Sequence, residues 1–187
     1  MIAAFKDDNK SYLVSVPYFT NLFSSDIKEL AQEENINIVK INGTNILVGA
    51  SDIGLEIDLV RLNTKLFNDG IDMYNIVGIA LALKDIFNDY DLLDDGKMNG
   101  EMIICDEKII YKIGTDFSVV RINSFYVTKE SPTDFNYVRT LMDLFEGSKK
   151  EKFIKTIKLL FKEYNVKNSK IYMLNTVDDE VEEIAIY

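Results

Sequence analysis

Hydrophobic periodicity changes in a definite order along these 187 residues. Alternating β-prone segments come first, two amphipathic helical segments follow, strands return, two more helical segments come next, and strands end the chain. Two helix pairs and two groups of antiparallel strands must each bury an apolar face. Stacking the sheets on each other, with a helix pair outside each, buries all of these faces. The order therefore predicts one α+β domain over residues 1–187, a four-layer αββα sandwich of two antiparallel sheets flanked by helix pairs.

β-branched and aromatic runs separated by polar turns define the expected strands. The turns include Asp7-Asp8-Asn9-Lys10 and Asn42-Gly43-Thr44, which predict two hairpins in the first part of the chain. The expected strands cover residues 1–6, 11–16, 36–41, 45–50, 101–107, 108–114, 117–127, 170–177 and 181–187.

Apolar residues spaced three and four apart predict the helices. The first pair covers about 51–67 and 73–89, after a short helix over 26–35. In the second pair, Pro132 opens a helix that Gly147 ends, and another helix runs over 148–166. This last helix carries lysines opposite its apolar stripe, which is typical of an outer-layer helix and also compatible with a surface for self-association.

Charge and composition exclude several classes of function. The net charge of −10, from 31 acids against 21 bases, disfavours nucleic acid and anionic membrane as partners. The sequence contains no run of about 18 apolar residues. With a single cysteine, Cys105, it suggests a cytoplasmic protein without an internal disulfide.

Histidine is absent, which removes catalytic triads built on histidine and the usual zinc sites. Cys105 lies in an apolar run, so we expect it to pack in the core. Two acidic stretches are weak candidates for cations. The stretch 91–102 has Leu93 and Met102 where a calcium loop needs oxygen ligands. We expect the other stretch to form a turn and a charged edge strand rather than a Mg²⁺ site; it comprises Asp178, Asp179, Glu180, Glu182 and Glu183.

The element order and several segments resemble bacterial-type proteasome subunits, a branch of the N-terminal-nucleophile (Ntn) hydrolases. These segments are MIAAFKDDNKSYLVSV, ENINIVKINGTNILVGASDIGLEIDLVR and GEMIICDEKIIYKIGTDFSVVRINSFYV. The most similar stretch is Gly49-Ala50-Ser51-Asp52, with Asp58 following near a helix start. The resemblance implies the αββα fold, and it implies activity only with a free N-terminal Thr, Ser or Cys, whose own amino group takes the proton.

The sequence departs from the pattern that such activity requires. It begins Met1-Ile2, and a residue as bulky as Ile2 predicts that Met1 is retained. The family's aspartate falls at Pro17 or Tyr18 and its lysine near Asn37. Lys40, three residues further, belongs to the opposite strand face. The family's Gly-Ser-Gly turn is replaced by residues 128–133.

The hydroxyls nearest the family's pocket are those of Ser11, Ser15, Thr20 and Ser51, and each is better explained as a cap or strand residue. Asp58 marks either a polar pocket or a solvent-facing position. We therefore predict no catalytic, cofactor-binding or metal-binding residue, and no cofactor.

The expected function is that of a catalytically inactive proteasome-subunit-like protein acting by assembly or binding, as a homo-oligomer or with a related subunit. The alternative is an Ntn-type peptidase or amidohydrolase with an unrecognised or processed nucleophile. A regulatory partner of an active paralogue is a third possibility.

Overall fold

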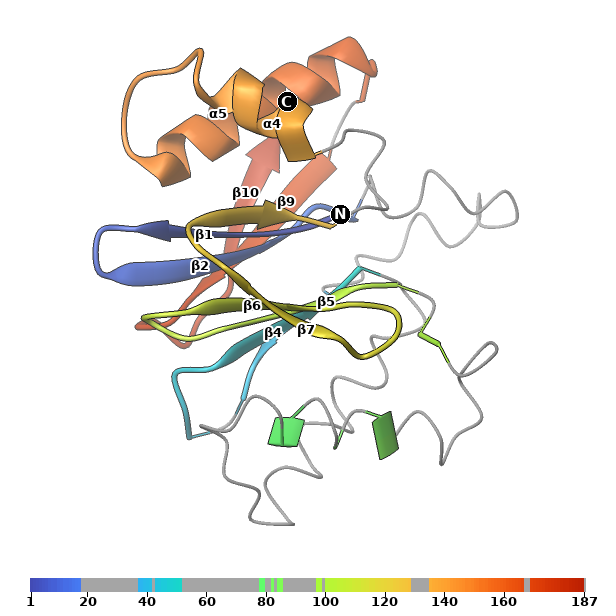
Figure 1. Cartoon of the computed structure of the whole chain (residues 1–187). Coiled ribbons are helices and arrows are strands. Elements are labelled where there is room, and N and C mark those ends of the chain that lie inside the picture. The colour runs from blue at the N-terminus through green and yellow to red at the C-terminus, as the bar shows by residue number, and fades with distance from the viewer. Residues whose placement is uncertain are drawn as a thin grey trace.

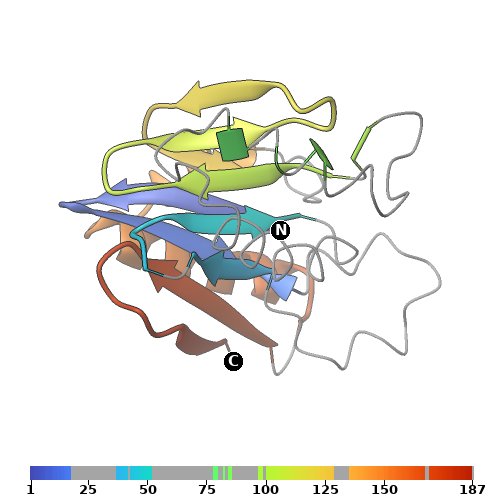
Figure 2. The ribbon, with the colours of Figure 1, turned by 90° about the horizontal axis from the view of Figure 1, so that it is seen from below.

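Two stacked antiparallel sheets, with a pair of helices on the outer face of one of them, form the described part of the molecule (Figure 1; Figure 2, from below). The structure is a computed structural model, and it describes residues 1–17, 37–41, 43–51, 78–79, 82, 84–85, 97–98, 100–128, 135–166 and 169–186. Within these residues no helix is both long enough and apolar enough to cross a bilayer.

Each sheet has five strands. The first sheet has the order β10-β9-β2-β1-β8, with β1 Ile2–Asp7, β2 Lys10–Ser15, β8 Phe125–Val127, β9 Ser169–Asn175 and β10 Glu182–Ile186. The second has the order β3-β4-β5-β6-β7, with β3 Ile38–Lys40, β4 Leu47–Ala50, β5 Met102–Cys105, β6 Ile110–Ile113 and β7 Val119–Ile122. The prediction of two antiparallel sheets is confirmed.

Both hairpins expected early in the chain are present. β1 and β2 pair from Ile2 opposite Ser15 to Asp7 opposite Lys10, and Asp8 turns the chain with a φ of 52°. β3 and β4 pair across a turn in which Gly43 has a φ of 75°, a region that glycine enters without a steric penalty.

The single strand expected over residues 117–127 is wrong, because this segment is two strands in different sheets. β7 stays beside β6, whereas β8 crosses to the edge of the first sheet and pairs with β1. The crossing occurs at Asn123 and Ser124, and the Ser124 carbonyl accepts a hydrogen bond from the Lys6 backbone N–H at 3.1 Å. Asn123 and Ser124 are weak strand formers and give a local sign of the break, but the pairing with β1 decides which sheet β8 joins.

The second helix pair is confirmed as α4 (Phe135–Met142) and α5 (Lys149–Glu163). Gly147 separates them with a φ of 120°. Ser148 caps α5: its hydroxyl accepts from the Glu151 N–H, and the Glu151 carboxylate accepts from the Ser148 N–H at 3.0 Å. The expected start at Ser148 is therefore correct, whereas the stop expected at Gly147 is wrong, because α4 already ends at Met142. The expected opening at Pro132 lies outside the described residues.

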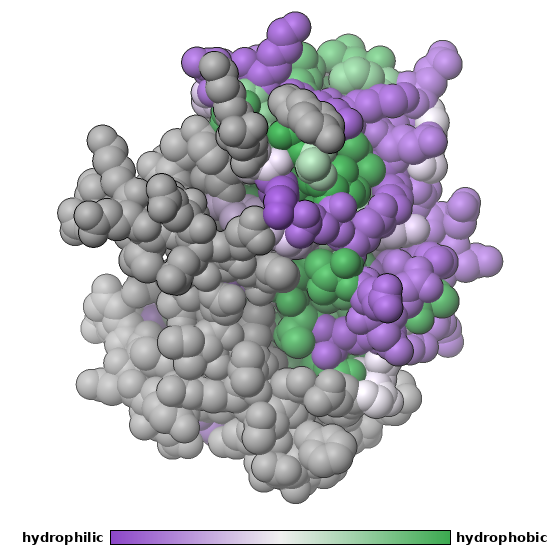
Figure 3. Space-filling view, turned by 180° about the vertical axis from the view of Figure 1, so that it is seen from behind, coloured by the Kyte–Doolittle hydropathy of each residue, from purple (hydrophilic) through white to green (hydrophobic). Residues whose placement is uncertain are grey.

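Three apolar layers show how the elements stack. The inner layer, between the sheets, includes Ile2, Leu13, Leu47 and Ile103. A second layer joins the first sheet to α4 and α5 through residues such as Phe5 and Phe153. The third covers the outer face of the second sheet. Seen from behind, hydrophilic side chains make up much of the described surface, with groups of hydrophobic ones between them (Figure 3).

The expected first helix pair falls mostly outside the described residues, as do the expected helix over 26–35, Thr20 and Asp58. Residues 78–79, 82 and 84–85 are described, and they are helical. Ile79 and Ala82 are buried in the third apolar layer, against Val48 and Ile104 of the second sheet. Helical residues thus contact the outer face of the second sheet, where the prediction puts the first helix pair.

Candidate functional site

The end of the sandwich where β1 begins holds most of the positions that correspond to the Ntn-hydrolase pattern. Met1 is 1% exposed, and its nitrogen donates a hydrogen bond to the Val16 carbonyl at 3.2 Å. Its side chain belongs to the apolar layer beneath α4 and α5, together with Phe5. Ile2, the next residue, is fully buried between the two sheets. The head of β1 is therefore apolar on both of its faces.

Hydroxyl groups at this end mainly hold the backbone. The Ser51 Oγ accepts from the Glu101 N–H at 2.9 Å, and the Thr128 Oγ1 accepts from the Ile2 N–H at 3.2 Å. The Ser15 Oγ is buried and has no hydrogen-bond partner among the described residues. None of these three hydroxyls is hydrogen-bonded to a side-chain carboxylate or amine in the described part of the chain. The geometry that activates a serine or threonine nucleophile requires such a neighbouring base.

Ser11 lies at the opposite end of β2. Its Oγ donates to the Asp106 carbonyl of the second sheet at 2.5 Å, and its backbone N–H donates to the Thr176 Oγ1 at 3.2 Å. Ser11 thus joins the two sheets. Together with Ser15, it is a strand residue, as the sequence predicts.

Asn37, which stands where the family's lysine is expected, is 1% exposed just before β3. Its backbone carbonyl accepts from the Ala50 N–H at 3.0 Å. Its Oδ1 has no hydrogen-bond partner among the described residues. Lys40 ends β3, and its Nζ lies 2.5 Å from an Asp179 carboxylate oxygen and 3.3 Å from the Asp178 carbonyl. Lys40 therefore binds the β9–β10 turn and does not take the place of the lysine that the family has near Asn37.

A buried polar cluster that the sequence analysis did not single out joins Glu101, Lys112 and Tyr126. Glu101 precedes β5, Lys112 lies on β6, and Tyr126 lies on β8 of the other sheet. The Tyr126 hydroxyl donates to Glu101 Oε2 at 2.6 Å, and the Lys112 Nζ donates to Oε1 at 3.2 Å. The Lys112 Nζ also sits 5.5 Å from the centre of the Tyr126 ring. The cluster bridges the sheets.

The alternation of side chains along the strands indicates this cluster in the sequence. In β6, Ile110 faces the inner apolar layer and Ile113 faces outward, so Lys112 shares the inward face with Ile110. Glu101 likewise shares its face with Ile103, two residues on. A charged residue at an inward position needs a partner, and an acid and a base at inward positions of adjacent strands could have been paired from the sequence.

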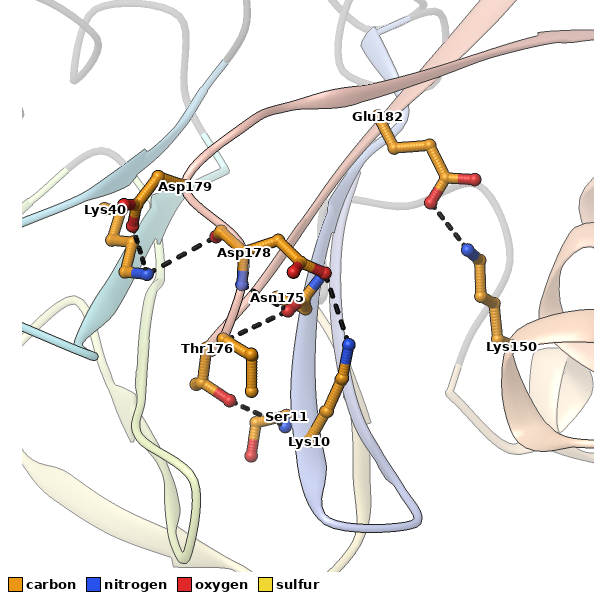
Figure 4. A network of polar contacts seen from close by, with 10 residues as sticks. Lys10, Ser11, Lys40, Lys150, Asn175, Thr176, Asp178, Asp179 and Glu182 are labelled. Carbon is orange, nitrogen blue, oxygen red and sulfur yellow. Dashed lines mark hydrogen bonds and ion pairs between the residues drawn. The ribbon is translucent and has the colours of Figure 1, made fainter.

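The acidic stretch around the β9–β10 turn is largely neutralised by lysines (Figure 4). Lys10 pairs with Asp178 at 3.2 Å, Lys40 with Asp179, and Lys150 with Glu182 at 2.6 Å. The Asn175 side chain and Lys10, both hydrogen-bonded to Asp178, lower the pKa of its carboxyl. The described residues contain no group of three or more acids, cysteines or histidines able to hold a metal. The prediction of a turn followed by a charged edge strand, β10, is confirmed.

Cys105 and α5 also take the expected places. Cys105 is fully buried in the inner layer, and burial raises the pKa of its thiol. α5 turns its apolar stripe toward the first sheet, with Phe153, Ile157 and Leu160 buried. Both observations agree with structural roles in the core and in the outer layer.

No family model matches the sequence, and no curated protein matches it. Solved structures do match. Eukaryotic HslV from Trypanosoma brucei superposes with a TM-score of 0.61 at 11% identity, covering 93% of this chain and 97% of HslV. BPH from Thiobacillus denitrificans gives a TM-score of 0.61 at 11% identity, covering 93% and 96%, and BPH in complex with epoxomicin gives 0.59 with the same identity and coverage. The likeness shows that this chain shares the fold of proteasome-like Ntn hydrolases.

Proposed function

We propose that this chain is a proteasome-subunit-like protein that acts by assembly or binding and does not hydrolyse peptides. The main support for the proposal is Met1, the residue directly before β1. Ntn hydrolases place a hydroxyl or thiol nucleophile there, whereas this chain has Met1, with its thioether side chain buried in an apolar layer. A thioether has no proton to give up to a base and cannot form the acyl intermediate of this chemistry.

The surroundings of Met1 support the proposal. Asn37 carries no charge that could lower the pKa of a nucleophile, and Pro17 or Tyr18 stands where the resemblance expects an aspartate. Lys40 is paired with Asp179. Glu101 and Lys112 are bound to each other. A nucleophile introduced here would lack its usual activating groups.

The resemblance to proteasome subunits also supports self-association in the cytoplasm, as a homo-oligomer or with a related subunit. Subunits of this fold assemble through their outer helices and loops. A light-scattering mass of the purified chain measures the assembly directly. A monomer at all concentrations would remove this part of the proposal.

Intact mass and N-terminal sequencing of the protein from its native host test the inactive state. The proposal expects Met1 to be retained, whereas a new terminus at a Thr, Ser or Cys would favour a processed Ntn-type peptidase or amidohydrolase. Incubation with epoxomicin, the compound bound in one BPH structure, gives a second readout by native mass spectrometry. We expect no adduct and no turnover of fluorogenic peptides. Turnover that a single hydroxyl substitution abolishes would refute the proposal.

A further inference from the structure

A groove of about 900 Å³ lies between β8 and α4 and reaches the first turns of α5. One wall is the segment from Arg121 to Val127, which includes β8, and the other is formed by α4 and the start of α5. The α4 helix directly follows and contacts this edge of the first sheet (Figure 1). The buried cluster around Glu101 reaches this wall only through Tyr126.

The backbone of β8 has an open edge. β8 is the last strand of the first sheet and pairs only with β1. The Ser124 carbonyl and the Thr128 N–H both bond to β1, so the alternation of antiparallel pairing turns the N–H and C=O groups of Phe125 and Val127 the other way. Within the described residues these groups have no hydrogen-bond partner. An open strand edge is a template for another extended segment.

Apolar and aromatic groups line the groove beside this edge. The Phe125 and Phe135 rings stack with centroids 5.4 Å apart, and the Tyr126 ring lies 6.3 Å from that of Phe135. Met142 of α4 completes this surface. Such a lining accepts an apolar side chain from a bound strand.

The rim of the groove is positive, although the chain as a whole carries a charge of −10. Four cationic residues line it, namely Arg121, Arg139, Lys149 and Lys152, against one acid, Asp143. None of the four takes part in an ion pair in the described part of the chain. In contrast, Lys10, Lys40, Lys112, Lys150 and Lys170 are all paired. Unpaired cations gathered at one groove attract an anionic ligand.

We propose that this groove binds an extended acidic peptide segment of a partner protein, which adds to β8 as a further strand. Its backbone bonds to Phe125 and Val127, its carboxylates face the cationic rim, and an apolar side chain lies on Phe135. A nucleic acid would also meet the cations. It cannot form the strand ladder, however, and the overall negative charge repels a polyphosphate. The inference rests on the proposed function only in that the chain acts by binding.

Fluorescence anisotropy with a labelled peptide of about eight residues, the length of an ordinary strand, tests the inference. The peptide carries glutamate at every second position except for one central valine in the same register, so that all of these side chains face the helices, and threonine at the positions between. One matched peptide replaces each glutamate by lysine, and another carries proline at alternate positions, which removes the backbone donors. The chain variants are Arg139→Glu and Lys152→Glu. Lys158→Glu is the control, because Lys158 is exposed on α5 outside the groove.

We expect the acidic peptide to bind, the lysine and proline peptides to bind at least tenfold more weakly, and each groove variant to lose about fivefold in affinity. Lys158→Glu should bind like the parent chain, and circular dichroism melting confirms that each variant is folded. Equal binding of acidic and basic peptides, no effect of the groove variants, or tighter binding of a single-stranded oligonucleotide would overturn the inference. None of these results bears on the retained Met1 or on hydrolysis, so failure here is separate from failure of the proposed function.

Discussion

Replacing Lys112 with methionine tests whether the buried polar bridge holds the two sheets together. Methionine keeps the length of the lysine stem and removes the ammonium group. Glu101, whose side chain is 6% exposed, then loses the cation 3.2 Å from its carboxylate. Removing one partner of a buried pair costs about 3–5 kcal/mol. Since the Lys112 side chain is 17% exposed and the Tyr126 hydroxyl still bonds to Glu101, we expect the lower end, about 3 kcal/mol.

Urea unfolding followed by circular dichroism measures this loss. For a chain of this size, about 3 kcal/mol corresponds to a fall in Tm of roughly 6–12 °C. Lys108→Met is the matched control, because Lys108 is exposed in the β5–β6 turn, and its free energy of unfolding should change by less than about 0.5 kcal/mol.

A double variant shows whether the loss of stability comes from the carboxylate charge left on Glu101 or from the loss of the ion pair itself. Adding Glu101→Gln to Lys112→Met removes the carboxylate charge that faced Lys112, so it should restore more than half of the lost stability. If Lys112→Met unfolds at the same urea concentration as Lys108→Met, the bridge contributes no measurable stability. Additive losses in the double variant would equally contradict the argument.

Three further substitutions test other parts of the structure. Gly49→Ala should cost about 1–3 kcal/mol in urea unfolding, because its Cβ would lie 3.0 Å from side-chain carbons of Ile2 and Leu13 across the inner layer. Ser148→Ala should cost about 1 kcal/mol, and hydrogen exchange should show earlier opening of the first turn of α5; unchanged exchange there would remove the role given to the cap. Asp178→Asn tests pH dependence. In the folded chain the pKa of the Asp178 carboxyl lies below its ordinary value of 3.8. The carboxylate therefore stabilises the fold at pH values above 3.8, and this contribution is lost as the pH falls through the folded pKa. The parent chain should therefore lose more stability than the variant on acidification below about pH 4, and parallel acid curves would contradict this.

The sequence predicted those parts of the fold that depend on local pattern. The hairpins at Asp8 and Gly43 and the helix start at Ser148 each rest on a few neighbouring residues. The order of strand groups and helix pairs, each with an apolar face to bury, indicated the stacked sheets. The likeness to HslV and BPH supports the same fold.

What the sequence did not predict depends on distant partners. Asn123 and Ser124 mark the division between β7 and β8 only weakly, and the choice of sheet follows from pairing with β1, more than 100 residues earlier. The groove beside β8 exists only because of this division. Its cations, such as Arg121 and Lys152, come from separate elements and form no motif in the sequence. The bridge at Glu101 could have been predicted from the sequence, because strand alternation places Glu101 on the inward face.

The polar contacts between the sheets bear on the alignment of the sheets as well as on stability. Apolar packing in the inner layer is non-directional and allows one sheet to slide over the other. Hydrogen bonds fix the alignment: Ser11 to Asp106 on one side and Tyr126 to Glu101 on the other. The Glu101 carboxylate that accepts from Tyr126 also binds the Lys112 ammonium group. We therefore expect the loss of either contact to loosen the alignment of the two sheets.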